Sequence, residues 1–245
     1  MPADESTSFQ RFTSIFNQIK QHEQVVDVSL SKLFNQLRRE SGSSSKICDL
    51  VDASPEDYDK LNIPASEYAR IINFSKRKNY EYCIVELYST FSNYMKDILK
   101  EMYNKKPKVI IHKANKTMTY ADISKFSNLN DLSNHMLDEI FREFEGQRST
   151  PKLVKRILSH TNVSISKDVS NSAMMYLQLR HLIIHNKSKV DNNYYSQYKD
   201  KLPIALGESI PADYQTVKAA MESVYIYLRE IDTQLIGDTC IDRRL

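Results

Sequence analysis

The sequence predicts an all-α protein, and three of its features point to that fold class. Only four of the 245 residues are glycine, against roughly 7% in average proteins, whereas sheet-rich folds use glycine freely in turns and bulges. Hydrophobic residues make up 41% of the chain and charged residues 27%, a globular rather than a disordered composition. Apolar residues recur at helical spacing through most of the chain. We therefore expect a helical bundle, with an N-terminal helical extension over residues 1–62 and a helical domain over residues 63–245.

The first apolar stripe covers residues 7–41 and predicts one long helix, or two helices with a break near residues 22–27. Gly42 follows in the position of a helix C-cap, and the serines around it are typical of an exposed loop. Ser54 and Pro55 have the order of an N-cap and a first-turn proline, which predicts a brief helical turn.

The longest periodic segment runs over residues 65–104, and Pro107 prevents its extension. Residues 109–112 and 116–120 then form two short β-prone runs, which predict a small β-hairpin. Two short strands cannot make a domain, so we expect this hairpin to be an ornament on a helical body.

The rest of the chain predicts four more helices. They cover residues 132–145, 151–160 with Thr150 as the N-cap, 169–185, and 212–235.

Composition also bears on location. No run of about 18 apolar residues is present, and the first residues are polar and acidic, so we expect neither a transmembrane helix nor a secretory signal. Cys48, Cys83 and Cys240 are scattered and odd in number, which excludes a disulfide framework and fits a reducing compartment. The sequence therefore predicts a cytoplasmic protein whose cysteines are structural or incidental.

Positive charge is concentrated in one part of the chain. The net charge is 34 − 31 = +3, but residues 146–190 contain eight basic residues and one acid, which gives +7 there and −4 elsewhere. Such a segment indicates an anionic partner met at one surface, or alternatively a solvated helical face.

One segment of the chain carries a candidate reactive motif: residues 179–187, with the sequence Leu-Arg-His-Leu-Ile-Ile-His-Asn-Lys. The chain has no glycine-rich phosphate loop, no Gly-x-Ser-x-Gly elbow and no His-Glu-x-x-His helix. Two other interpretations of the segment are open. Its cations could simply interact with the dipole at a helix C-terminus. His181 and His185, four residues apart, could also bind Zn²⁺, although no third ligand is recognisable nearby.

This segment resembles the signature of the HEPN superfamily, in which an Arg is followed by four to six residues and then a His. Arg180 and His185 match the two signature positions, and His181 fills the polar slot after the Arg. The resemblance covers about residues 79–200, with residues 79–102 in the place of the family's first core helix. One departure is that residues 91–93 are Phe-Ser-Asn, where many relatives carry an acidic residue.

The resemblance implies an endoribonuclease that needs no metal or other cofactor. It also implies a homodimer with a composite site, in the role of a toxin or antiviral-defence effector with a possible antitoxin or regulatory partner. The alternatives are a non-catalytic helical module that binds RNA or nucleotides, and a protein-interaction scaffold.

The chemistry of the motif suits RNA cleavage. His185 can act as general acid or base near neutral pH, and Arg180 can clamp phosphate oxygens. His181 and Asn186 would orient these two groups. Further cations would hold the RNA backbone; they are Lys187, Lys189, Lys152, Lys155 and Arg156.

Helix geometry limits how these groups can meet. Residues five apart on a helix differ by about 140° in direction. Arg180 and His185 therefore diverge unless the helix ends or bends between them, or a second copy completes the site. Tyr194, Tyr195 and Tyr198 follow the motif, and we expect them to pack their segment onto the body rather than to stack on bases.

Overall fold

The structure, a computed structural model, describes residues 4–40, 45–106, 117–145, 149–159 and 161–244. Within these ranges it is all-α, as predicted, and the β-structure is confined to two isolated bridges, Lys46–Pro64 and Lys189–Ser209. The helices and 3₁₀ turns (η) are α1 (Thr7–Glu40), α2 (Ile47–Leu50), η1 (Asp59–Leu61), η2 (Ala65–Glu67), α3 (Tyr68–Lys105), α5 (Tyr120–Ile123), α6 (Leu129–Glu145), α7 (Thr150–Leu158), α8 (Lys167–His185), α9 (Asn192–Tyr198) and α10 (Tyr214–Gly237).

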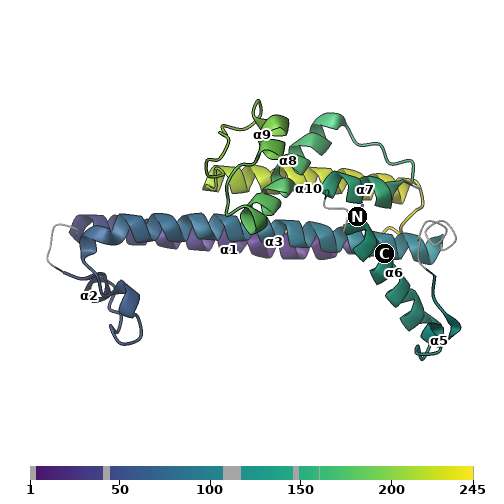
Figure 1. Cartoon of the computed structure of the whole chain (residues 1–245), viewed down its shortest axis with the longest axis horizontal. Coiled ribbons are helices and arrows are strands. Elements are labelled where there is room, and N and C mark those ends of the chain that lie inside the picture. The colour runs from purple at the N-terminus through teal and green to yellow at the C-terminus, as the bar shows by residue number, and fades with distance from the viewer. Residues whose placement is uncertain (1–3, 41–44, 107–116, 146–148, 160, 245) are drawn as a thin grey trace.

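Two long helices, α1 and α3, lie side by side and form the axis of the molecule (Figure 1). They have 34 and 38 residues, which corresponds to lengths of about 51 and 57 Å. They run antiparallel, because Ser8 bonds to Glu101 near one end of the pair and Asp27 bonds to Lys76 farther along. The other long helices, α8 and α10, pack on one side of this pair.

The main core lies where α1, α3, α8 and α10 meet. Its fully buried side chains include Phe9, Phe91, Tyr94, Leu179 and Leu228. The first half of α1 therefore contributes to the same core as the later helices. The division of the chain at residue 62 remains a prediction.

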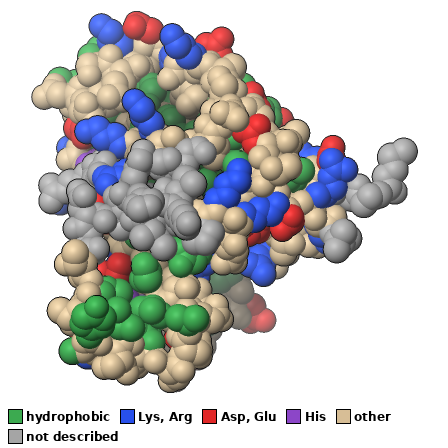
Figure 2. Space-filling model, turned by 90° about the vertical axis from the view of Figure 1, so that its right-hand side faces the viewer, with side chains coloured by type: hydrophobic (Ala, Val, Ile, Leu, Met, Phe, Trp, Pro, Cys, Tyr) green, Lys and Arg blue, Asp and Glu red, His purple; other side chains and the backbone are tan. Residues whose placement is uncertain are grey.

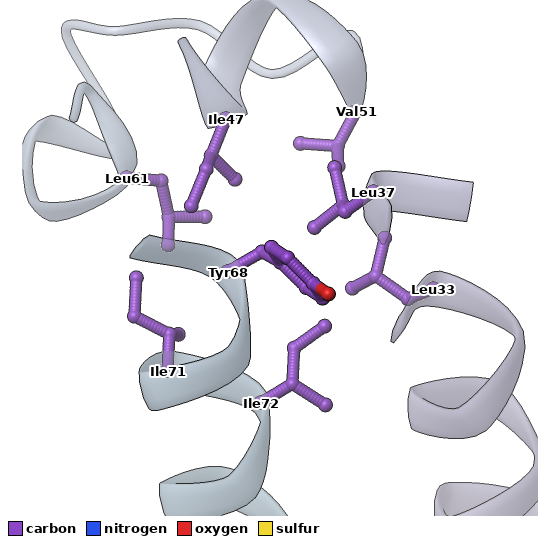
Figure 3. A pocket seen from close by; sticks show the side chains of 8 residues that line it. All are labelled: Leu33, Leu37, Ile47, Val51, Leu61, Tyr68, Ile71 and Ile72. Atoms are coloured by element: carbon purple, nitrogen blue, oxygen red, sulfur yellow. The ribbon is translucent and has the colours of Figure 1, made fainter. Parts of the chain in front are cut away.

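A second, smaller cluster lies at the far end of the α1–α3 pair. Leu37, Ile47 and Ile72 are buried there, at 1%, 3% and 3% exposure. Figure 3 shows their side chains around a pocket of about 150 Å³, with the ring of Tyr68 at its centre. We call this group, with the residues that line the pocket, the distal cluster; the lining residues are Leu33, Leu37, Ile47, Val51, Leu61, Tyr68, Ile71 and Ile72.

The opposite end of the molecule carries α5 and the start of α6, which project from the body (Figure 1). Hydrophobic side chains gather there on the surface, at the lower end of the view in Figure 2. Tyr120 and Leu129 are 93% and 81% exposed. Among the described helices, none combines the length and apolar character needed to cross a membrane.

Several helix boundaries differ from the sequence predictions. For residues 7–41, by contrast, the structure agrees with the first of the two alternatives, one long helix, because α1 is continuous through residues 22–27. Ser149 rather than Thr150 is the N-cap of α7, so the predicted Thr150 cap is wrong. The short helix α2 was not predicted, because four residues give no readable periodicity.

The predicted β-hairpin falls largely outside the described residues, which resume at residue 117. Where its second strand is described, the prediction is wrong, because residues 117–119 form no strand and Tyr120 begins α5. The side chain of Thr119 accepts a hydrogen bond from the Asp122 amide and so caps this helix. This local cap explains why a helix begins at Tyr120, where the second strand was expected to end.

The three cysteines, Cys48, Cys83 and Cys240, are free and buried. Burial raises the pKa of the Cys83 thiol to about 12, so this thiol is protonated near neutral pH and is a poor nucleophile. These findings agree with the structural role expected for the cysteines.

Candidate functional site

The signature motif lies at the C-terminal end of α8. Ser166 caps the start of this helix, because its hydroxyl accepts a hydrogen bond from the Val169 amide. Leu177, Leu179 and Leu182 are buried and anchor the helix in the core. The helix ends at His185, so the motif residues occupy its last turns.

A tight turn follows α8 and is held by several hydrogen bonds. Lys187 and Ser188 have φ values of +53° and +59°, the left-handed region that ends a helix abruptly. The side-chain amide of Asn186 donates to the Lys189 carbonyl at 2.7 Å. The Ser188 amide donates to the Leu182 carbonyl at 3.0 Å, and the Ser188 carbonyl accepts from Ile210 at 2.9 Å. The residues after His185 are therefore fixed in place, and Asn186 orients the turn.

A buried carboxylate on α3, Glu81, contacts this turn and holds it against α3. Glu81 is 4% exposed and accepts hydrogen bonds from Arg77 at 3.1 Å, from Lys78 at 2.6 Å and from the hydroxyl of Ser188. Burial disfavours its charged form, but the hydrogen bonds from Lys78, Ser188 and Arg77 outweigh burial and lower the pKa of Glu81.

The role of Glu81 was not predicted from the sequence, because nothing local indicates its contact with Ser188. The available signal was the cation pair Arg77–Lys78 placed four and three residues before an acid on the same helix.

The two motif histidines lie side by side. Both are exposed, and the ring centroids of His181 and His185 are 5.0 Å apart, with the ring planes tilted by 47°. This follows from their spacing of four residues, which places them on one face of α8. Across the described part of the chain, no three His, Cys, Asp or Glu side chains group so as to hold a metal ion.

Arg180 lies on a different face of the helix. Its guanidinium carbon sits 5.1 Å from the ring centroid of Tyr88 on α3, a cation–π contact, and the side chain is partly buried. Among the described residues, Arg180 makes no hydrogen bond or ion pair, and none links it to His181 or His185. Within one chain the structure thus brings the two histidines together and directs Arg180 towards α3, in line with the 140° separation.

The candidate RNA-binding cations fall into two groups. Lys187 and Lys189 are exposed in the turn beside the histidines, while Lys152 and Lys155 are exposed on α7. Arg156, also on α7, bonds to Glu143 of α6 at 2.9 Å.

The two groups lie near opposite ends of α10. After α7 the chain bonds to the end of α10, where the Asn162 amide donates to Asp238 at 3.0 Å. The turn after α8 instead bonds to the segment just before α10, through Val190 and Glu208 at 2.8 Å. Because α10 has 24 residues, it separates these points by about 36 Å. Only Lys187 and Lys189 of this set belong to the site at the end of α8.

The tyrosines after the motif pack onto the body. Tyr194 and Tyr198 are 2% and 7% exposed. The Tyr194 hydroxyl donates to the Met175 carbonyl at 2.9 Å, and the side chain of Gln178 donates to the Tyr198 hydroxyl at 2.9 Å. The packing interpretation is therefore confirmed for these two residues.

Comparison with known proteins adds no assignment: no family model, curated protein or solved structure matches this chain.

Proposed function

We propose that this protein is a metal-independent endoribonuclease of the HEPN type, with His181 and His185 as its reacting groups. The observation that carries the proposal is the pairing of two exposed imidazoles, 5.0 Å apart at the end of α8, beside the exposed cations Lys187 and Lys189. Two imidazoles provide both a proton acceptor and a proton donor near neutral pH.

The reaction needs no group from outside the substrate to act as nucleophile. One imidazole takes the proton of the ribose 2′-hydroxyl as its oxygen attacks the adjacent phosphorus. The bond from phosphorus to the 5′-oxygen breaks, and the other imidazole gives that oxygen its proton. The products are a 2′,3′-cyclic phosphate and a free 5′-hydroxyl. The lysines in the turn attract the RNA backbone.

Arg180 enters the proposal through a second copy of the chain. Its guanidinium is held over Tyr88, away from the histidines of its own chain, whereas Ile184 between the histidines is 50% exposed. A homodimer formed around Ile184 would cover this apolar side chain and could bring Arg180 of one copy towards the histidines of the other. There Arg180 would stabilise charge on the phosphate.

The test is cleavage of single-stranded RNA in EDTA by the wild type and by Arg180→Ala, His181→Ala and His185→Ala variants. The wild type should cut RNA, but not DNA of the same sequence, which lacks the 2′-hydroxyl. Each histidine variant should lose about 10²- to 10⁴-fold in rate with an unchanged circular dichroism spectrum. His135→Ala is the matched control, because His135 is an exposed histidine on α6, and its rate should not change.

Mixing the Arg180→Ala and His185→Ala chains tests the composite site. If each site takes Arg180 from one copy and His185 from the other, mixed dimers regain one intact site and part of the activity. If mixing restores nothing while the wild type is active, the site lies within one chain.

A second candidate, RNA binding without cleavage, is favoured by the contact of Arg180 with Tyr88, which occupies the guanidinium in the single chain. This function predicts a gel shift that weakens strongly with salt, with no 2′,3′-cyclic phosphate products. Absence of products from wild-type protein that binds RNA would replace the first proposal with this one.

A further inference from the structure

The surface of α3 next to the motif turn combines cations with an exposed aromatic ring. Glu81 bonds both to Ser188 of the turn and to Arg77 and Lys78 of α3. It therefore joins two segments, more than a hundred residues apart in sequence, into one surface. Figure 1 shows the end of α8 lying over α3.

Phe74 continues this surface along α3. It lies seven residues, or nearly two turns, before Glu81, so the two residues lie on the same face of the helix, about 20° apart. Yet the Phe74 side chain is 61% exposed. The ammonium group of Lys78 sits 5.8 Å from the centre of its ring. The site therefore offers a largely exposed aromatic ring with a cation over it.

The charges around the turn favour a polyanion on the α3 side. Lys187 and Lys189 are exposed and, among the described residues, form no ion pair. Lys78 is 54% exposed, whereas its partner Glu81 is only 5% exposed at the side chain, so the positive group faces solvent and the negative one does not. Asp191 and Glu208 border the turn on its other side, towards α9. A bound anionic strand is therefore directed towards α3.

We propose that this surface, formed by Phe74, Lys78, Lys187 and Lys189, binds single-stranded RNA next to the histidine pair, with one unpaired base stacked on Phe74. The inference rests on the proposed function and extends it. It specifies that the substrate is single-stranded and that the bound strand runs from the turn after α8 towards α3. Aromatic stacking requires a base free of its own stack and pairing partner, and the lysines contact phosphates without regard to sequence.

The experiment measures binding separately from cleavage. The probe is a fluorescent 12-nucleotide RNA with 2′-O-methyl riboses, which cannot be cleaved by 2′-oxygen attack, and its binding is followed by anisotropy at several salt concentrations. Phe74→Ala should weaken binding about 10-fold and leave the salt slope unchanged. Lys78→Gln should reduce the slope of log K against log salt by about 0.7, the amount expected for one phosphate contact on a single strand.

Two controls make the result specific. Tyr120→Ala removes an aromatic ring that is 93% exposed on α5, and it should leave binding unchanged. A duplex of the same sequence should bind the wild type and Phe74→Ala equally, because its bases are not available to stack. An unchanged affinity of Phe74→Ala for the single strand, an equal loss on the duplex, or no binding of the probe by the wild type would each overturn the proposal.

The outcome separates this inference from the nuclease proposal. Cleavage that depends on His185, together with normal binding by Phe74→Ala, would remove the stacking site and leave the nuclease. If Phe74→Ala weakens binding but the wild type yields no cyclic phosphate, the stacking site stands and the nuclease proposal is removed.

Discussion

Two buried carboxyl groups show how the body of this protein differs from the arm formed by the outer parts of α1 and α3. Asp232, in the body, is 0% exposed. It accepts hydrogen bonds from the Ser6 amide at 2.9 Å, the Ser6 hydroxyl at 2.5 Å and the Tyr94 hydroxyl at 3.1 Å. Glu23, where the arm begins, is 3% exposed, but its Oε1 atom has no hydrogen-bond partner among the described residues.

The difference indicates where stability and strain are located. A buried polar group with partners fixes a unique packing, whereas one without partners costs about 1–3 kcal/mol. In the body, Asp232 joins the start of the chain to α3 and α10. In the arm, Glu23 faces Asp27 on its own helix and Tyr80 and Cys83 on α3, and none of these supplies a partner for Oε1. We therefore expect removal of the two carboxylates to have opposite effects.

The largest expected effect is that of Asp232→Ala, which should lower the free energy of unfolding by about 3 kcal/mol. The change leaves the Ser6 amide and the Tyr94 hydroxyl buried without an acceptor. The measurement is urea unfolding followed by circular dichroism. Asp200→Ala, at an exposed position after α9, should change the midpoint little. A similar midpoint for both variants would contradict the role assigned to Asp232.

Glu23→Gln should have the opposite sign, and its effect should depend on pH. Burial, with a smaller contribution from Asp27, raises the pKa of Glu23 from 4.5 to about 7 in the folded protein. The wild type therefore loses stability as pH rises from about 4.5 to 7, because the unfolded chain ionises first. Glutamine cannot ionise, so the variant should be more stable than the wild type by about 3 kcal/mol at pH 8 and nearly equal to it at pH 4.5.

Urea midpoints at the two pH values test this, with Glu222→Gln as the control at an exposed position on α10. A stability difference of the same size at both pH values would show that ionisation of Glu23 is not its cause.

The contrast between local and distant contacts also explains what the sequence could predict. The spacing of His181 and His185 sets their shared face, and the five-residue spacing of Arg180 and His185 sets their divergence. Both relations lie within one helix, and the structure agrees with both. The long helices were predicted for the same reason, since each carries a periodic apolar stripe.

Contacts between distant segments were not accessible in this way. The bond from Ser188 to Glu81 joins the turn after α8 to α3, and no local pattern contains it. The same holds for α2, which starts where the Ile47 amide donates to the Ile63 carbonyl at 3.0 Å. The α7 cations were predicted to join the motif because the two segments are close along the chain. In the structure they lie near opposite ends of α10.

The smallest effect is expected in the distal cluster, where the arm is closed by few buried residues around the pocket of about 150 Å³. Val51→Leu adds one methylene to the lining shown in Figure 3 and should raise local stability by about 0.5–1 kcal/mol. Because only the distal cluster is affected, amide hydrogen exchange should slow in α2 and in residues 59–67, while exchange in α8 and α10 stays the same. Val25→Leu, at a valine of α1 that is 65% exposed, should alter neither region. Faster exchange in α2 of the Val51→Leu variant would mean that the pocket has no room for a further methylene. The local stability of the distal cluster would then depend on its turns rather than on its packing.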